Sequence, residues 1–233
     1  MTDTATTNDT AAASTRAALL GRMTRTGLYL VTDDRLDPGE LVRRLDAALG
    51  AGADVVQFRD KREDRAAVAA AGRLVAEHCR AAGAMFIVND DAQLAAELQA
   101  DGLHVGQDDA APAEARKIVG PACIIGLSVS HLPEADVAAR DPDVDYIGFG
   151  ALFTTPTKPD AEPAGPDMLA EARKRVAFPI VGIGGITAEN LAAAFEAGAD
   201  SVAVVSAVFS APDPAAATRN LRAAIARARS GAW

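Results

Sequence analysis

Eight short apolar runs divide this chain at regular intervals, and a longer, alanine-rich segment follows each of them. Most runs are continuously apolar instead of alternating with polar residues, which is typical of parallel strands covered on both faces. The intervening segments have helical length, as at 40–49, 64–82 and 188–197. The predicted strands are 28–32, 55–58, 85–88, 102–105, 123–127, 146–149, 180–183 and 201–205.

An aspartate precedes every second predicted strand, so one βαβα unit recurs four times. Asp54, Asp101, Asp145 and Asp200 lie 47, 44 and 55 positions apart. Eight βα units with no strand left over close best as a (β/α)8 TIM barrel, an α/β fold. The length of 233 residues fits one such domain. An open, doubly wound sheet is the alternative.

The barrel is predicted to occupy residues 25–229 as a single catalytic domain, with a last helix near 214–229. Residues 1–24 begin with a stretch rich in Thr and Ala that lacks an apolar core. We therefore expect 1–24 to be a disordered tail and not a secretory signal. Residues 230–233 are expected to form a short C-terminal tail.

Composition excludes several classes of partner. The net charge is −9, the pI is near 4.8 and no run is rich in Lys or Arg, so nucleic acid is not expected to bind. No apolar run approaches the roughly 20 residues of a membrane span. Cys79 and Cys123 lie far apart within apolar patterns, which favours buried thiols in the cytoplasm. Small molecules are the expected partners, and a homo-oligomer is left open.

In a barrel of this kind, functional residues lie just after the strands. Gln57, Phe58, Arg59, Asp60 and Lys61 span the end of the second predicted strand and the loop that follows. An amide, a guanidinium and an ammonium at one mouth suit phosphate or pyrophosphate oxygens. An ordinary loop with surface charges is the alternative.

Acidic residues follow the third and fourth predicted strands, at Asn89-Asp90-Asp91 and Gln107-Asp108-Asp109. Carboxylates on adjacent strand tips can share one hard cation, and Mg²⁺ prefers one or two carboxylates with phosphate oxygens and water. Asp91 is also typical of a helix N-cap, and Asp108 of exposed surface. His104, inside a strand, is better interpreted as a supporting residue than as a base.

The later strands carry hydroxyls and glycines. Ser128 follows the fifth strand as a hydrogen-bond donor, whereas His131 is better interpreted as a helix-entry residue. Gly184, Gly185 and Ser206 follow the last two strands, where barrels often bind phosphate, although a tight turn without a ligand would look alike. A polar loop after the sixth strand could close over substrate. The layout suits two phosphorylated substrates.

Taken together and in order, these motifs resemble thiamine phosphate synthase from about Gly27 to Ala207. The resemblance implies a transferase of thiamine biosynthesis in which a thiazole phosphate nitrogen displaces pyrophosphate from a hydroxymethylpyrimidine. It also implies a dissociative, Mg²⁺-assisted reaction in which pyrophosphate leaves first. The motifs are Gln57 to Lys61, Asn89 to Asp91, Asp101 to Asp109, Thr155 to Lys158 and Gly182 to Ile186.

The family pattern implies a role for each matching residue. Asp90 and Asp109 would hold Mg²⁺. Arg59, Lys61, Ser128 and Lys158 would be catalytic. The pyrimidine pyrophosphate would be bound by Gln57, Phe58, Arg59, Asp60, Lys61, Asn89, Ser128 and Lys158. The thiazole phosphate would be bound by Thr155, Pro156, Thr157, Gly185, Val205 and Ser206.

The chain departs from the family pattern where Ala151 and Thr154 replace usual prolines, so the sixth loop is expected to be less rigid. Ser130 competes with Ser128 for the substrate contact, and Ser128 is preferred because it lies closer to the strand end. A thiazole tautomerase or regulatory homologue on the same fold is the alternative, but such relatives lack pyrophosphate and metal residues that this chain retains. Phosphosugar isomerases explain a phosphate site after the last two strands but not the Asp pair with the basic cluster. A non-enzymatic binding barrel would predict ligand affinity without turnover.

Overall fold

The computed structural model describes residues 3–155 and 163–231, and their strands form one closed parallel barrel in chain order. β1 pairs with β8 at Leu28↔Val202, which closes the ring and excludes the open sheet. The eight predicted strands are confirmed, with ends that shift by at most two residues. They are β1 Leu28–Val31, β2 Val55–Phe58, β3 Met85–Asn89, β4 Gly102–Val105, β5 Ile124–Val129, β6 Tyr146–Phe149, β7 Ile180–Ile183 and β8 Ser201–Val204.

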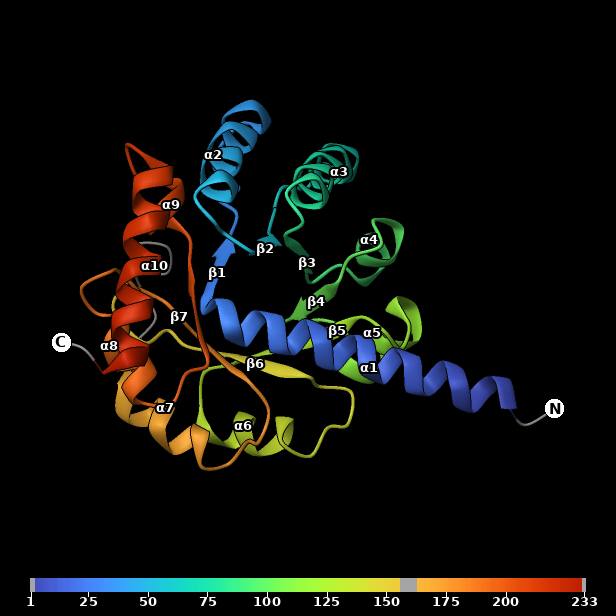
Figure 1. The fold of residues 1–233 in the computed structure, drawn as a ribbon. Coiled ribbons are helices and arrows are strands. Elements are labelled where there is room, and N and C mark those ends of the chain that lie inside the picture. Colours follow the sequence, from blue (N-terminus) through green and yellow to red (C-terminus); the bar gives the residue numbers. More distant parts are fainter. Residues whose placement is uncertain (1–2, 156–162, 232–233) are drawn as a thin grey trace.

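Helices surround the barrel (Figure 1). Several begin where an aspartate side chain caps the first turn, as Asp37, Asp64 and Asp213 do for α2, α3 and α10. The helices are α1 Asp3–Thr26, α2 Pro38–Gly50, α3 Arg65–Ala81, α4 Ala92–Glu97, α5 Pro112–Val119, α6 Leu132–Ala138, α7 Gly165–Arg173, α8 Leu191–Glu196, α9 Ser206–Phe209 and α10 Pro214–Ser230. Among the described residues, no helix is both long and apolar enough to cross a membrane.

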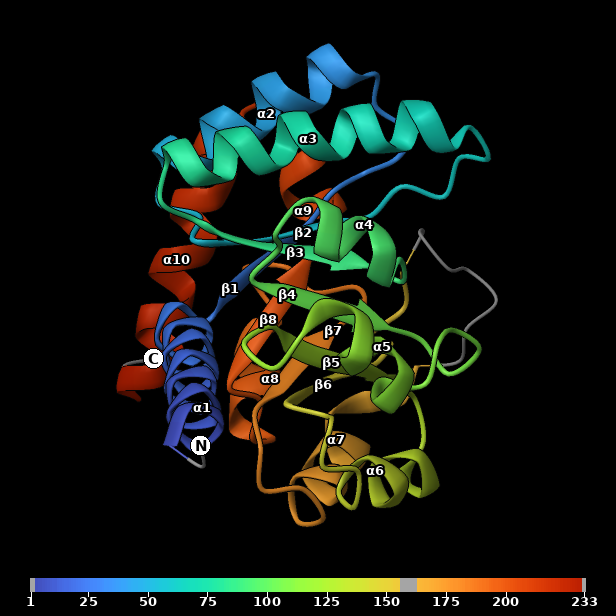
Figure 2. The same ribbon diagram turned by 90° about the vertical axis from the view of Figure 1, so that its right-hand side faces the viewer.

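Two apolar layers follow from strand alternation, because successive side chains point to opposite faces. The larger layer lies between the strands and the surrounding helices. The smaller fills the barrel interior and includes Tyr29, Met85, Tyr146 and Val181. Figure 2 shows α2 and α3 side by side on the outside of the barrel.

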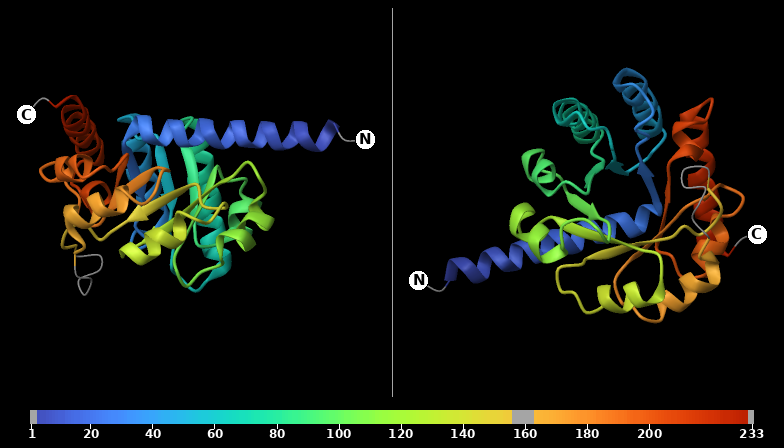
Figure 3. Two further views of the ribbon diagram at one scale, coloured as in Figure 1. Left: turned by 90° about the horizontal axis from the view of Figure 1, so that it is seen from below. Right: turned by 180° about the vertical axis from the view of Figure 1, so that it is seen from behind.

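The prediction of a disordered tail at 1–24 is wrong for the described part, because Asp3–Thr26 forms the helix α1. α1 crosses the end of the barrel where the strands begin, as Figures 1 and 3 show. Met23 is 1% exposed and packs into the interior layer, with Leu19 and Leu20 beside it. Arg22 pairs with Asp54 just before β2. Scattered contacts from Ala12 to Thr26 hold this polar helix on the barrel, and such contacts leave only a weak signal in the sequence.

The recurring aspartates have a structural explanation at this same end. Asp101, Asp145 and Asp200 each accept a 2.8 Å hydrogen bond from the backbone N–H at the start of the preceding strand. Asp54 instead accepts hydrogen bonds from Arg22 and Thr26 of α1. The repeated aspartates therefore connect the beginnings of neighbouring strands. The candidate functional residues lie at the opposite end of the barrel, the mouth, where the strands end.

Candidate active site

The end of β2 directs alternate side chains to opposite sides of the barrel wall. The Gln57 side chain points inward, where its Nε2 donates to the Tyr29 hydroxyl at 2.9 Å. Phe58 lies on the outer face, buried against Gly72 of α3. The Phe58 ring therefore belongs to the layer between strand and helix, and the binding of the pyrimidine pyrophosphate by Phe58 stays a prediction.

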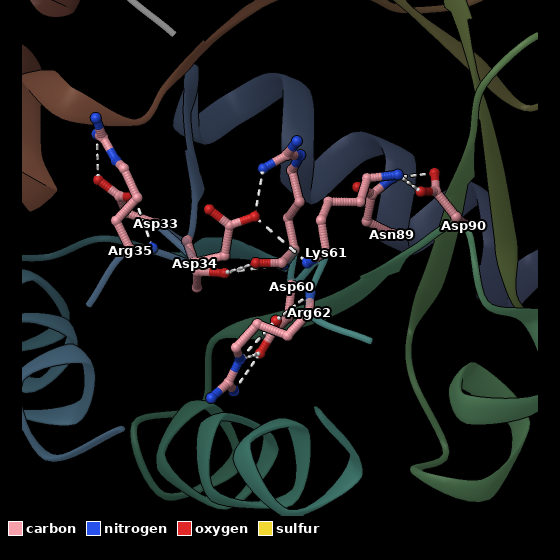
Figure 4. A network of polar contacts seen from close by, with 10 residues as sticks. Asp33, Asp34, Arg35, Asp60, Lys61, Arg62, Asn89 and Asp90 are labelled. Carbon is pink, nitrogen blue, oxygen red and sulfur yellow. Dashed lines mark hydrogen bonds and ion pairs between the residues drawn. The ribbon is translucent and has the colours of Figure 1, made fainter. Parts of the chain in front are cut away.

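Two basic residues of the loop after β2 face carboxylates from neighbouring strand ends. Arg59 Nη1 lies 3.0 Å from Asp34 Oδ2, and the backbone N–H of Lys61 donates to the same carboxylate. The Lys61 ammonium pairs with Asp90. Figure 4 shows Asp34 and Asp90 on either side of this loop. The Arg59 and Lys61 side chains are thus held close together at the mouth, where both could bind the oxygens of an anionic ligand.

The Asp60 side chain stabilises the loop after β2. Its carboxylate accepts hydrogen bonds from both the backbone N–H and the guanidinium of Arg62, at 3.1 Å and 2.9 Å. Figure 4 places this pair apart from Lys61 and Asp90. The binding of the pyrimidine pyrophosphate by Asp60, which the family pattern implies, stays a prediction.

Asp90 and Asp109 lie at the ends of adjacent strands and interact with each other. Burial and the Asp109 carboxylate raise the pKa of Asp90, although Lys61 opposes the shift. Burial acts in the same direction on Asp109, but hydrogen bonds from Asp90 and the Gly106 N–H lower its pKa overall. Two carboxylates this close repel unless a proton or a cation lies between them.

The remaining polar residues of these loops differ in role. Asn89 donates to the Asp90 carboxylate and, at 3.2 Å, to the His104 carbonyl. Asp91 accepts from the Leu94 N–H as the N-cap of α4, which confirms the helix-cap interpretation. Asp108 is exposed, as expected.

Ser128 lies within β5 and points into the barrel mouth. Its hydroxyl lies 3.0 Å from His104 Nε2, and His104 Nδ1 lies 3.1 Å from the Tyr146 hydroxyl. Burial lowers the pKa of His104 to about 4, so the ring is neutral at physiological pH. Ser130 is exposed, and its backbone N–H donates to Glu134 at the start of α6, which supports the choice of Ser128. His131 is the N-cap residue of α6, as expected.

The opposite wall of the mouth is built from the ends of β7 and β8. Gly185 has a φ of 65°, and a side chain there would meet backbone oxygens of Phe153 and Thr154. Asn190 donates to the Gly185 carbonyl at 2.9 Å and accepts from the Thr187 N–H at 2.8 Å. Val205 and Ser206 follow β8 at the start of α9. Thr155 belongs to the adjoining loop, whereas Pro156, Thr157 and Lys158 lie outside the described residues.

A family model described as thiamine monophosphate synthase matches residues 28–208, which include nearly all of the mouth described above. The chain belongs to the thiamine monophosphate synthase family. It is thus a transferase of thiamine biosynthesis, and the resemblance noted in the motifs is confirmed. The thiamine-phosphate synthase of Roseiflexus castenholzii is 48% identical over 198 residues, covering 84% of this chain and 86% of that protein.

Other members of the thiamine monophosphate synthase family agree. A bifunctional thiamine biosynthesis protein of Geobacter sulfurreducens is 49% identical over 195 residues, covering 84% of this chain but 39% of that longer protein. The structure of a thiamine phosphate pyrophosphorylase from Pyrococcus furiosus is 34% identical, with a TM-score of 0.80 and coverage of 89% of this chain and 98% of that one. The structural comparison and the sequence comparisons therefore indicate the same family.

Two groups of residues at this family site were missed in the sequence. Asp33 and Asp34 follow β1 after Thr32, and the rule that polar residues after strands are functional candidates would have found them. Tyr29 and Tyr146 lie inside strands. Only the alternation of side chains along a strand could have indicated that they point into the barrel. Both tyrosines are buried, which makes them look like ordinary core residues in a sequence.

Proposed function

We propose that this chain condenses 4-amino-2-methyl-5-hydroxymethylpyrimidine pyrophosphate with 4-methyl-5-(2-hydroxyethyl)thiazole phosphate. The bond between the pyrimidine methylene carbon and the pyrophosphate oxygen breaks first, and its electron pair leaves with pyrophosphate. The thiazole nitrogen then supplies its lone pair to the methylene carbon. The products are thiamine phosphate and pyrophosphate.

The observation that carries the proposal is the meeting of Arg59, Lys61 and Asn89 with the Asp90–Asp109 pair at one mouth. Negative charge develops on the leaving group, so preorganised cations at this position favour departure. Burial keeps His104 neutral and hence free of charge that would oppose a cationic pyrimidine. A second phosphate would bind across the mouth, near Gly185 and Ser206.

We propose that Asp90 and Asp109 hold Mg²⁺ together with pyrophosphate oxygens. Among residues 3–155 and 163–231, no group of three or more His, Cys, Asp or Glu side chains is arranged to hold a metal. Two hard carboxylates are nevertheless what Mg²⁺ accepts from a protein when substrate and water complete its shell. When bound, the ion would neutralise charge on the departing pyrophosphate. The repulsion between the two carboxylates supports this fit.

The wider setting of the reaction is also a proposal. We expect a cytoplasmic enzyme, since Cys79 and Cys123 are both buried, free thiols whose pKa is raised by burial to about 12. Its partners would be the two phosphorylated small molecules. A homo-oligomer remains open, and light scattering of the purified protein would decide it.

The test is pyrophosphate release by the purified protein given both substrates, with Mg²⁺ and then with EDTA. We expect release that requires both substrates and the metal, with thiamine phosphate formed in equal amount. Binding of the thiazole phosphate without any release would favour the tautomerase or regulatory alternative. Release that persists in EDTA would overturn the metal proposal and leave the reaction itself intact.

A further inference from the structure

Five polar side chains from five strands form a continuous hydrogen-bonded chain inside the barrel. Gln57 Nε2 lies 2.9 Å from the Tyr29 hydroxyl, and that hydroxyl lies 3.1 Å from the hydroxyl of Tyr146. The Tyr146 hydroxyl lies 3.1 Å from His104 Nδ1, and His104 Nε2 lies 3.0 Å from the Ser128 hydroxyl. The chain therefore connects Gln57 and Ser128, two residues of the mouth.

Two glycines make room for the middle of this chain. A Cβ atom on Gly126 of β5 would collide with the Tyr146 ring and with His104 Nδ1. A Cβ atom on Gly148 of β6 would lie 2.9 Å from His104 Cε1 and 3.2 Å from His104 Nε2. The two rings are thus packed directly against bare backbone, with centroids 5.5 Å apart. Rings confined in this way have few alternative orientations.

Either tyrosine hydroxyl can be the donor of their contact, so two orders of donors are open to the chain. In one of them, the Gln57 amide nitrogen donates to the Tyr29 oxygen, and the Tyr29 O–H donates to Tyr146. The Tyr146 O–H then donates to His104 Nδ1, and a neutral imidazole accepting at Nδ1 carries its proton on Nε2. The Ser128 oxygen accepts a hydrogen bond from this Nε2–H, so the Ser128 O–H takes no part in the chain.

We propose that Tyr29, Tyr146 and His104 are positioning residues that hold Ser128 as a hydrogen-bond donor toward the pyrimidine pyrophosphate. The inference rests on the proposed function, because it takes that molecule to be the ligand of the mouth. A serine that accepts a hydrogen bond from His104 keeps its own O–H available for a ligand at the mouth. With the opposite order of donors, the Ser128 O–H would donate to His104, and Ser128 would present only lone pairs, which repel phosphate oxygens.

The first test is the tautomer of His104, measured by nitrogen NMR on protein labelled at histidine. The chain has three histidines, and His104→Gln identifies the signal. At mildly alkaline pH and without substrate, we expect the proton on Nε2. A proton on Nδ1 would overturn the proposal whatever the enzyme turns over. In Tyr146→Phe, which removes the donor to Nδ1, we expect the preference for Nε2 to weaken.

The second test is a double-mutant cycle in kcat for pyrophosphate release. Tyr146→Phe should lower kcat about tenfold, the effect of one lost hydrogen bond expressed in the rate. In a Ser128→Ala background, the same change should lower kcat less than about twofold, because residues that act as a unit are not additive. Equal losses in both backgrounds would mean that Tyr146 does not act through Ser128.

Ser201→Ala is the matched control, since Ser201 is a buried residue of β8 whose hydroxyl donates to the Met23 carbonyl at the far end of the barrel. We expect it to lower thermal stability and to leave kcat unchanged. If Ser201→Ala lowered kcat as much as Tyr146→Phe does, loss of stability would explain both effects, and the positioning role of Tyr146 would be refuted. If the wild-type protein forms no thiamine phosphate, the proposed function fails, while the tautomer still decides the donor order.

Discussion

Each cation at the mouth faces a carboxylate, and this pairing decides how single substitutions act. Arg59 faces Asp34, Lys61 faces Asp90 and Arg35 faces Asp33. The basic partners are partly exposed, with 30%, 52% and 62% of their side-chain surface accessible. The Arg59–Asp34 and Lys61–Asp90 pairs are partly exposed on both sides, and such pairs contribute little to folding stability. Substitutions here should therefore change ligand binding and turnover more than the free energy of unfolding.

Asp90→Asn is the most direct test of a single residue at the mouth. Asp90 has a φ of 63°, and asparagine tolerates this left-handed conformation as well as aspartate does. We expect turnover to fall by about a hundredfold or more because the proposed Mg²⁺ site loses a charge, with the melting temperature nearly unchanged. Pyrophosphate release and thermal unfolding, measured on the same preparation, check this.

The neighbouring Asp91→Asn is the matched control for Asp90→Asn. Asp91 caps α4, and asparagine caps a helix about as well as aspartate. Turnover and stability should both stay close to those of the wild type. A near-normal rate in Asp90→Asn, or an equal loss in Asp91→Asn, would refute the role of Asp90 in metal binding.

At the scale of elements, the loops after β6 and β7 are packed against each other through Gly185. Gly185→Ala would strain a backbone with φ of 65° and would also push against the Phe153 oxygen, 2.8 Å from the new Cβ. We expect the KM for the thiazole phosphate to rise about tenfold or more, because the loop proposed to bind its phosphate must move. Steady-state kinetics with the thiazole phosphate varied measures this.

Gly83→Ala separates backbone strain from loop displacement. Gly83 has a similar φ of 68°, but a Cβ there has no heavy atom within 4 Å. This variant should lose about 1–2 kcal/mol of stability from the left-handed conformation alone and keep the wild-type KM. A raised KM in Gly83→Ala would show that general destabilisation, and not the contact with the sixth loop, causes the effect.

The α1 helix closes the end of the barrel opposite to the mouth, and Met23 is its buried contact. Met23→Ala should cost about 2–5 kcal/mol of unfolding free energy, since it opens a cavity beneath the barrel. Turnover well below the melting temperature should persist, because the mouth lies at the other end. Urea unfolding compares this variant with Leu74→Ala, whose side chain is 40% exposed. Equal midpoints would mean that α1 does not support the barrel.

For the whole molecule, acid stability depends on carboxylates that the fold pairs with arginines. Hydrogen bonds from Arg35 lower the pKa of Asp33 below its ordinary 3.8. For Asp54, burial opposes the shift, but hydrogen bonds from Arg22 and Thr26 lower the pKa overall. A carboxylate with a lowered folded-state pKa stabilises the fold above its unfolded pKa, and this contribution is lost as the pH falls through the folded value.

Arg22→Met tests this linkage. The variant should be less stable than the wild type near neutral pH, and the difference should shrink as the pH falls below about 3.8, where Asp54 becomes protonated in both proteins. Urea unfolding at about pH 7 and about pH 3 measures the two differences. A difference that stays constant with pH would show that Arg22 acts through packing and its bond to the Gly83 carbonyl instead.

Much of the barrel was predictable because its signals are local. Continuous apolar runs such as 146–149 and 180–183 became β6 and β7 without any shift. Asp91 and His131 were correctly interpreted as helix-entry residues, since a cap depends on residues within one turn. Residues that follow strands, such as Lys61 and Asp90, could be assigned to one mouth because all strands run in parallel.

Tertiary structure decided which of those side chains meet. Phe58 and Asp60 belong to the same motif as Arg59, yet one packs against α3 and the other pairs with Arg62. The Tyr29 and Tyr146 hydroxyls meet across 117 positions of sequence, which only closure of the barrel can bring about. The docking of α1 likewise depends on barrel closure, because Met23 packs against interior side chains that only the closed barrel brings together. Strand and cap formation depend on a few consecutive residues, whereas contacts across a barrel depend on all eight strands at once.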